Sequence, residues 1–254
     1  MRWAGTTMSQ QLFYLAMAGL GATIDRVTAA TNNLANRGTT AYKAQQPVFR
    51  ALPLYGQGLP DRVIVDAQED SADFRAGSLE NTGRNLDLAI KGDGWIVVRA
   101  GDGSLGLTRN GALAISSTGL VETQDGHPVM GRGFAPIVLP PLQTVTIGED
   151  GTVSGTLIGQ TPDQIATVNR IMLVNPPTSS LRRRPDGLFQ DATGAPQPDA
   201  AVRLQVGALE GSNADTVAMM MSMIENTRMF QTQTELMRIV LNAGQGQGTP
   251  LSLS

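Results

Sequence analysis

Catalytic chemistry in this sequence would have to be built around His127, which is the only histidine. A Ser-His-Asp triad needs such a base, and the base must itself be oriented by a third group. His127 stands in a short turn motif, Asp125-Gly126-His127-Pro128, where an exposed side chain is the simpler interpretation. We therefore predict no catalytic residue and no enzyme.

Two glycine-containing patterns imitate ligand sites. Residues 101–106 match the G-x-G-x-x-G fingerprint of dinucleotide binding, but that fingerprint needs a helix N-terminus directly after it. A strand and the Asn110-Gly111 hairpin are predicted to follow instead. The repeated Asp-Gly pairs could suggest calcium, yet none lies in a D-x-[DN]-x-[DN]-G loop with a closing Glu. The sequence therefore predicts turns, and neither a cofactor nor a small-molecule substrate.

Two clusters of like side chains have simple structural explanations. Six methionines lie between Met219 and Met237, and a copper site is one interpretation of them. A thioether at helical spacing is more often a core filler, so no metal is predicted. Arg182, Arg183 and Arg184 form the sharpest charge cluster and are interpreted as a solvated loop tip. A contact between this cluster and an acidic patch on a neighbouring subunit is the alternative.

The composition is typical of a soluble chain that can bury a core of ordinary size. Its 254 residues are 41% hydrophobic and 16% charged, and the formal net charge is −3. Without an excess of basic residues, nucleic acid is not expected as a partner. The sequence has no cysteine, which excludes disulfides and thiolate chemistry but leaves the redox compartment open. A short signal peptide, formed by Arg2 and residues 12–22, is the alternative to export without a cleaved leader.

The first forty residues predict a long helix with one apolar edge. Ser9 or Thr7 can cap its first turn, and Gly38 can follow its end near Asn36. Apolar positions separated alternately by four and three residues form a heptad seam. These positions are Phe13, Met17, Leu20, Ile24, Val27, Thr31 and Leu34.

A second helix of the same kind is predicted at the other end, with cap chemistry from Ser212, Asn213 and Asp215. Its seam consists of Met220, Met223, Thr227, Phe230, Thr234, Met237 and Leu241. Each seam spans ~21 residues, or ~32 Å, and neither helix can cover its apolar edge alone. The simplest partner is the other terminus. Flanking apolar residues such as Leu15 and Met221 widen each edge, which favours neighbouring copies over an ordinary two-helix core within one domain.

Between the helices the pattern changes to short apolar runs with period two, such as residues 95–99 and 105–108, which is typical of antiparallel strands. The predicted fold class is mainly β with terminal α-helices: discontinuous N- and C-terminal coiled-coil helices carry an inserted β-rich central domain. The predicted parts are paired terminal helices (8–43 and 210–243), an extended connector (44–84), the β-rich central domain (85–209) and a disordered tail (244–254).

Several motifs resemble one known family. The run Thr31-Asn32-Asn33-Leu34-Ala35-Asn36, followed by Thr39-Thr40-Ala41-Tyr42-Lys43, is similar to the N-terminal signature of flagellar rod and hook proteins. Gly92-Asp93-Gly94-Trp95 resembles part of the family's central block, and Leu209-Glu210-Gly211-Ser212-Asn213 its C-terminal signature. The motifs cover nearly the whole chain in the family's order. Ala41 departs from the pattern, because the family usually has glycine there.

The resemblance implies a structural subunit of the bacterial flagellar basal-body rod that polymerises through its terminal helices into a helical tube transmitting motor torque. The short length and the Asp186-Gly187-Leu188-Phe189 segment resemble proximal rod subunits, with a distal rod subunit as the alternative. The alternatives from other functional classes are a secreted β-rich enzyme and a binding module with a coiled-coil stalk. The implied partners are other copies, other rod proteins and the flagellar export apparatus, and the implied location is periplasmic, without a cleaved signal peptide.

The residues predicted to mediate assembly come from both helices. In the first helix they are Phe13, Met17, Leu20, Ile24, Val27, Leu34, Asn32, Asn33 and Asn36. In the second helix they are Met220, Met223, Ile224, Phe230, Met237 and Leu241.

Overall fold

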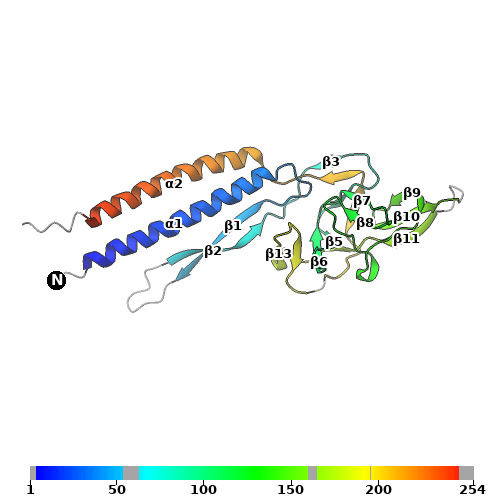
Figure 1. The fold of residues 1–254 in the computed structure, drawn as a ribbon, viewed down its shortest axis with the longest axis horizontal. Helices are drawn as coiled ribbons and strands as arrows, with labels where there is room; N and C mark the ends of the chain where they lie inside the picture. The colour runs from blue at the N-terminus through cyan, green and yellow to red at the C-terminus, as the bar shows by residue number, and fades with distance from the viewer. Residues whose placement is uncertain (1–3, 54–62, 160–164, 195, 246–254) are drawn as a thin grey trace, which may run out of the picture. The chain divides into compact units, whose positions relative to one another are not determined.

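The computed structural model describes residues 4–53, 63–159, 165–194 and 196–245 (Figure 1). These residues form two compact units. The helical unit contains residues 4–35, 45–53, 63–71 and 215–245, and the β unit contains residues 36–44 and 72–214 in their described parts. Neither helix of the described chain is both long and apolar enough to cross a membrane.

Two long helices dominate the helical unit, and Figure 1 shows them side by side. They are α1 (Ala4–Ala35) and α2 (Thr216–Gln245). The predicted end of the first helix near Asn36 is confirmed, but α1 begins before the predicted caps Ser9 and Thr7. The start of α2 is capped as predicted, because the Asp215 carboxylate accepts hydrogen bonds from the backbone N–H groups of Val217 (2.9 Å) and Ala218 (3.2 Å).

The helical unit also contains two paired strands, β1 (Gln45–Pro53) and β2 (Val63–Ala72). Residues 44–84 therefore do not form the extended connector predicted from their prolines and glycines. Proline is excluded from central strands because it lacks an N–H donor, but a two-stranded sheet has only edge strands. Pro47 and Pro53 are consequently compatible with β1. The predicted tail from Gly244 begins inside α2, and its residues 246–254 lie outside the described chain.

The β unit confirms the mainly β character of the chain. Its largest sheet has five antiparallel strands in the order β12-β5-β6-β14-β13, and a second sheet has the order β11-β10-β9. Three two-stranded sheets pair β15 with β4, β16 with β3, and β7 with β8. The strands are β3 (Leu79–Asn81), β4 (Leu88–Lys91), β5 (Trp95–Arg99), β6 (Leu105–Thr108), β7 (Leu113–Ile115), β8 (Val121–Thr123), β9 (Leu142–Ile147), β10 (Thr152–Leu157), β11 (Ile165–Arg170), β12 (Leu173–Val174), β13 (Leu181–Arg183), β14 (Phe189–Asp191), β15 (Arg203–Val206) and β16 (Ala208–Glu210).

Strand β5 lies between two hydrophobic clusters of the β unit. Successive side chains of a strand point to opposite faces. Ile96 and Val98 accordingly join one cluster, whereas Trp95 and Val97 join the other. In the second cluster the ring centroids of Trp95 and Phe189 are 4.9 Å apart. Because both faces of β5 are buried, its sequence is a continuous apolar run.

The Asp-Gly pairs form turns, as predicted. Gly103, Gly126, Gly151 and Gly187 all have φ between 82° and 84°, a conformation that favours glycine. In three of these turns an Asp carboxylate accepts the backbone N–H two residues ahead, for example Asp102 from Ser104 at 2.9 Å. These carboxylates therefore stabilise the turns locally.

Residues 36–44 form the turn that follows α1, and Ala41 in this turn has φ +56°. A non-glycine residue in this left-handed region costs about 1–2 kcal/mol because its Cβ approaches the following carbonyl. The conformation gives a physical reason for the glycine usual at this position in flagellar rod and hook proteins.

We predict that Ala41→Gly raises the free energy of unfolding by up to about 1 kcal/mol, since the relief of strain exceeds the added entropy of the unfolded chain. The control is Ala135→Gly, because Ala135 is exposed and has an ordinary extended backbone (φ −96°, ψ 144°). That substitution should lower the stability slightly. Urea denaturation of both variants measures the difference, and an equal effect of the two substitutions would contradict the interpretation.

Candidate functional site

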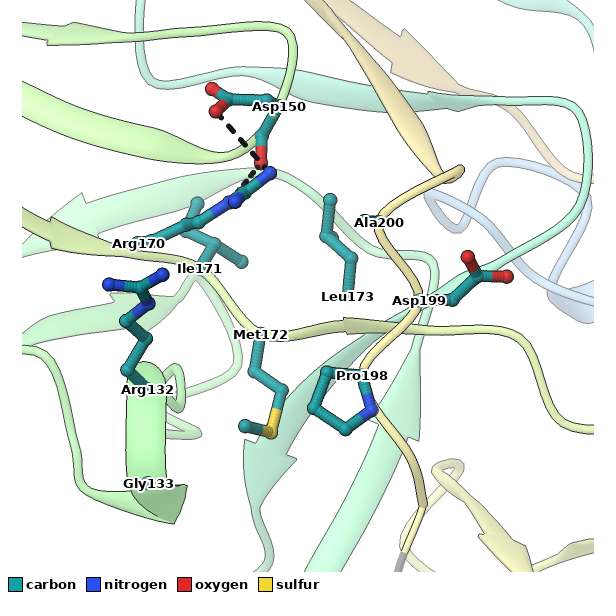
Figure 2. Close-up of a pocket in the computed structure, with 10 residues that line it drawn as sticks. All are labelled: Arg132, Gly133, Asp150, Arg170, Ile171, Met172, Leu173, Pro198, Asp199 and Ala200. Carbon is teal, nitrogen blue, oxygen red and sulfur yellow. Dashed lines mark hydrogen bonds and ion pairs between the residues drawn. The ribbon is translucent and has the colours of Figure 1, made fainter.

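A pocket of about 230 Å³ in the β unit lacks the chemistry of a catalytic site (Figure 2). Its apolar lining includes Met172 and Pro198. Of its charged side chains, Arg170 is held by Asp150, with the Arg170 Nε donating to the Asp150 carbonyl at 2.8 Å. The ten described residues around it include neither a histidine nor a hydroxyl nucleophile.

The motifs that imitate catalytic and ligand sites have structural roles. Residues 101–106 run into β6 rather than a helix, as predicted. His127 lies in the turn after β8, where its backbone carbonyl accepts the Thr123 N–H at 2.9 Å. Across the described residues, no three His, Cys, Asp or Glu side chains gather in a way that could hold a metal ion.

The arginine cluster is not the solvated loop tip that we predicted. The guanidinium of Arg183 lies between two aromatic rings, 5.1 Å from the centroid of Tyr42 and 5.0 Å from that of Phe189, and it donates to the Lys43 carbonyl. Arg184 pairs with Asp102 at 2.9 Å. Two of the three arginines thus bind groups within the β unit.

The strongest electrostatic feature of the β unit is a buried group of three charges. Lys43 and Glu210 are each 1% exposed and form an ion pair at 2.7 Å. Arg109 donates to the other Glu210 oxygen, also at 2.7 Å, and its remaining nitrogens donate to the carbonyls of Gly92 and Gly94. A buried charge costs several kcal/mol unless its hydrogen bonds are complete. Here every member of the group has several partners.

This group joins three distant segments of the chain within the β unit. The Lys43 ammonium donates to the Arg75 carbonyl at 2.8 Å, and Glu210 accepts the Gly77 N–H at 3.0 Å. Asn213 repeats the connection: its amide accepts the Ala44 N–H at 2.7 Å and donates to the carbonyls of residues 73 and 75. Residues 41–44 and 210–213 are therefore held side by side.

The pKa values of the two central groups follow from this arrangement. Burial alone would raise the pKa of the Glu210 carboxyl, but the hydrogen bond from Lys43 and the charge of Arg109 hold it below its ordinary value. Burial lowers the pKa of Lys43 below 10.5, and the bond to Glu210 offsets only part of that shift. A carboxyl whose pKa lies below its ordinary value is ionised at neutral pH, so Glu210 is charged there.

In the helical unit, α1 and α2 contact each other through polar and small side chains. The Thr23 hydroxyl donates to the Gln233 amide oxygen at 3.0 Å, and the Asn33 amide donates to the sulfur of Met219 at 3.6 Å. The Arg26 guanidinium approaches the sulfur of Met229 at 3.9 Å. Residue numbers rise along one helix as they fall along the other, so the two helices are antiparallel.

The predicted seams have the right spacing but the wrong phase for this contact. Thr23, Arg26 and Asn33 each precede a predicted seam residue by one position, and so do the contact residues of α2. A step of one residue turns a side chain by about 100° around the helix. On α1, Met17 and Ile24 are 48% and 49% exposed, whereas Leu20, Val27 and Leu34 are half-buried. The Phe13 side chain lies outside the described part of the structure.

The predicted residues of α2 follow the same pattern. Met220, Phe230 and Leu241 are exposed, as is Ile224 farther around the helix, while Met223 and Met237 are half-buried. In an antiparallel pair, the residues that follow the contact residues by one position point to the same side of the pair on both helices. The two stripes therefore form one surface, here called the apolar face. Its members are Met17, Leu20, Ile24 and Val27 on α1 with Met220, Met223, Phe230 and Leu241 on α2.

The predicted asparagines make hydrogen bonds within the chain, and their part in assembly stays a prediction. Asn33 is buried, and its amide makes two hydrogen bonds with the backbone of Gln45 at the start of β1, at 2.7 and 2.9 Å. Asn32 is exposed and donates to the Gln45 side chain at 3.1 Å. In the β unit, Asn36 accepts hydrogen bonds from the backbone N–H and hydroxyl of Thr39. Asn32 and Asn33 thus join β1 to α1.

Sequence reasoning missed the buried charges. Lys43 and Glu210 lie 167 residues apart, and a charged residue is solvated in most proteins. The available signal was their place in the two terminal signatures: Lys43 ends the first and Glu210 lies in the second. Charged residues inside motifs at opposite ends of a chain are candidates for a direct pair.

We predict that Glu210→Gln lowers the free energy of unfolding of the β unit by about 3–5 kcal/mol, because it leaves Lys43 buried without its counter-ion. The matched control is Glu149→Gln, whose partner Lys91 is exposed and whose own side chain is 68% exposed. The control should change the stability by less than about 1 kcal/mol. Urea denaturation followed by tryptophan fluorescence measures both, and similar losses in the two variants would refute the assignment.

Acid should destabilise the β unit through the same group. Since the folded-state pKa of Glu210 is below its ordinary value, the unfolded chain binds the proton more tightly. The stabilisation is complete above the ordinary pKa and is lost as pH falls through the lowered value. Urea denaturation between about pH 7 and pH 3 should show this loss. In Glu210→Gln the loss should be smaller, and parallel curves for the two proteins would contradict the prediction.

Comparisons with known proteins agree on one family. The family model "Flagellar hook protein FlgE/F/G D1 domain" matches residues 89–155, and "Flagellar basal body rod FlgEFG protein C-terminal" matches residues 205–240. The flagellar basal-body rod protein FlgF of Salmonella typhimurium is 37% identical over 92% of this chain and 94% of its own length. FlgF of Escherichia coli is 38% identical over 89% of this chain and 92% of its own. FlgG of Buchnera aphidicola subsp. Schizaphis graminum is 27% identical over 87% of this chain and 92% of its own length.

The second matched region begins in β15 and runs into α2, so it includes Glu210 of the buried group, the neighbouring Asn213, and Met220 and Phe230 of the apolar face. The chain belongs to the flagellar basal-body rod proteins, and within that family it is most like FlgF.

Proposed function

We propose that this chain is a structural subunit of the proximal flagellar rod and that it polymerises through α1 and α2 into a helical tube that transmits motor torque. As a rod protein it is not an enzyme. The observation that carries the polymerisation is the apolar face, where Met17, Ile24, Met220 and Phe230 stay 38–49% exposed even though the two helices are paired.

Covering the apolar face would contribute substantial free energy. Fully burying a Leu, Ile, Met or Phe side chain is worth roughly 1.5–3 kcal/mol, so completing the burial of several half-exposed ones contributes several kcal/mol per subunit. An isolated pair of helices joined by polar contacts is marginal in water. Helices of this kind would be ordered fully by stacking against neighbouring subunits.

The distribution of apolar residues on α2 favours an open assembly over a closed dimer. Leu236 and Ile239 are 53% and 56% exposed, and helical spacing turns both of them away from the apolar face. Each helix pair thus presents two unlike apolar surfaces. When unlike patches on identical subunits bind each other, the contact repeats from copy to copy and generates a helical array.

Localisation and partners follow from rod membership. Basal-body rod homologues place the protein in the flagellar basal body. Export by the flagellar apparatus without a cleaved leader, assembly in the periplasm, and contact with FlgG and further proximal rod subunits are parts of the proposal. Nucleic acid is not a proposed partner, because the net charge is −3. The distal rod protein FlgG is the alternative assignment, and the 37–38% identities to FlgF favour the proximal one.

A binding module with a helical stalk is the alternative from another class. Such a module would need its helices only as a spacer or as a small closed oligomer. A charge placed on the apolar face would then leave motility unchanged, so the following experiment separates the two functions.

We predict that Ile24→Asp reduces incorporation of the chain into basal bodies about tenfold or more, because assembly would bury an unpaired carboxylate. The matched control is Thr28→Asp, which adds the same charge to α1 at an exposed position one helical turn away that is already polar. The measurements are immunoblots of purified basal bodies and swimming in soft agar, in cells that depend on this chain for motility.

Thr28→Asp should incorporate normally, and circular dichroism should give both variants the same helix content. Truncation after residue 215 removes α2 while keeping Glu210 and Asn213 in the β unit, and it should abolish incorporation. Normal swimming with either Ile24→Asp or the truncated chain would exclude assembly through these helices.

A further inference from the structure

We infer that a polar notch formed by Gly19 and Thr23 on α1 receives Gln233 of α2 and fixes the register in which the two helices pair. The notch lies among contacts that otherwise involve small or flexible side chains. It belongs entirely to the helical unit, and it occupies the side of each helix adjoining the apolar face.

The shape of the notch depends on the absence of a side chain at position 19. A Cβ at Gly19 would lie 3.2 Å from the Gln233 side-chain nitrogen, which is closer than most Cβ contacts, so Gln233 would have to shift by a few tenths of an ångström. Glycine inside a helix costs about 1 kcal/mol relative to alanine. Its presence in the middle of α1 is accounted for by the space that Gln233 occupies.

Thr23 supplies the floor and the hydrogen bonds of the notch. It is 0% exposed, and its hydroxyl oxygen lies 3.0 Å from the Gln233 amide oxygen and 2.9 Å from the Gly19 carbonyl. A hydroxyl has one proton and can donate fully to only one of them. If the amide is turned over, its nitrogen donates to Thr23 while the hydroxyl donates to Gly19, and all three groups are satisfied.

A register shift would break this arrangement at a cost that apolar contacts do not impose. One heptad away, the position opposite Thr23 would be taken by Val240, which offers no hydrogen bond, or by Asn226, whose amide is one methylene group shorter than that of Gln233. A single buried polar residue in a helix seam is known to select register in this way. Methionines such as Met219 and Met229 adapt to many packings and select little.

The register decides which surface the pair presents. With Gln233 in the notch, the stripes of α1 and α2 lie at matched heights on one side and form the apolar face. A slip of one heptad would move about a third of each ~21-residue stripe beyond its partner. This consequence for assembly depends on the proposed function, whereas the register itself is a property of the free chain.

Cross-linking tests the register directly, because the native sequence has no cysteine. In dilute purified chain, Arg26→Cys combined with Met229→Cys reports the native register. Arg26→Cys combined with Ser222→Cys or Leu236→Cys reports a slip of one heptad in either direction. A short bis-maleimide should join the native pair several-fold more than either slipped pair. Equal yields, or no yield from the native pair, would overturn the inference.

Removing the notch should remove the preference for the native register. Thr23→Val with Gln233→Leu keeps the shapes but deletes the hydrogen bonds, and we expect the ratio of native to slipped cross-link to fall about fivefold, or about 1 kcal/mol. Gly19→Ala favours the helix but fills the notch, and it should lower the ratio as well. Thr28→Val with Gln231→Leu makes the same exchanges at exposed positions and should leave the ratio unchanged.

An unchanged ratio in both notch variants would exclude the notch as the register determinant. The result does not involve assembly, so it leaves the proposed function standing. Conversely, if Ile24→Asp failed to impair incorporation while the cross-links followed the notch, the proposed function would fail and the register inference would hold.

Discussion

The β unit depends on the neutralisation of Glu210. Its carboxylate is almost completely buried, and it accepts hydrogen bonds from Lys43, Arg109 and the Gly77 N–H. A buried carboxylate without these donors costs several kcal/mol, so the three segments that supply them must be in place together. Since Lys43 precedes most of the β unit and Glu210 follows nearly all of it, their pair makes the unit's fold conditional on both of its ends.

The phase of the helix contact shows the limit of pattern reasoning. The sequence predicts both helices, their lengths and a heptad period, because apolar residues recur every three or four positions. It does not say which side of each helix meets the other. The structure selects Thr23 and Gln233 for the contact, and the apolar stripes lie one residue away. The hydrophobic pattern predicts a contact through the apolar stripes, but in the structure hydrogen-bonded side chains make the contact within the chain.

In the β unit, the sequence predicts a strand correctly where a buried apolar run ends at recognisable turn residues. Strands β5 and β6 have the predicted bounds, since each is an apolar run closed by Gly-containing turns. Strands such as β11 and β13 were missed because they are short or polar, and β13 contains Arg182 and Arg183. β11 pairs with β10 and β13 with β14, and Arg183 of β13 also lies against the rings of Tyr42 and Phe189, so these contacts override the local preference.

The two units therefore satisfy the same physical requirement in different ways. The β unit hides its apolar side chains in two clusters of its own and completes the hydrogen bonds of its buried charges. The helical unit uses polar side chains for its internal contact and leaves Ile24 and Met220 about half exposed. Had the helices paired through their stripes, the apolar surface would be consumed within one chain and little would remain to bind a neighbour. A polar intrachain contact keeps that surface free, which is the condition that the proposed polymerisation requires.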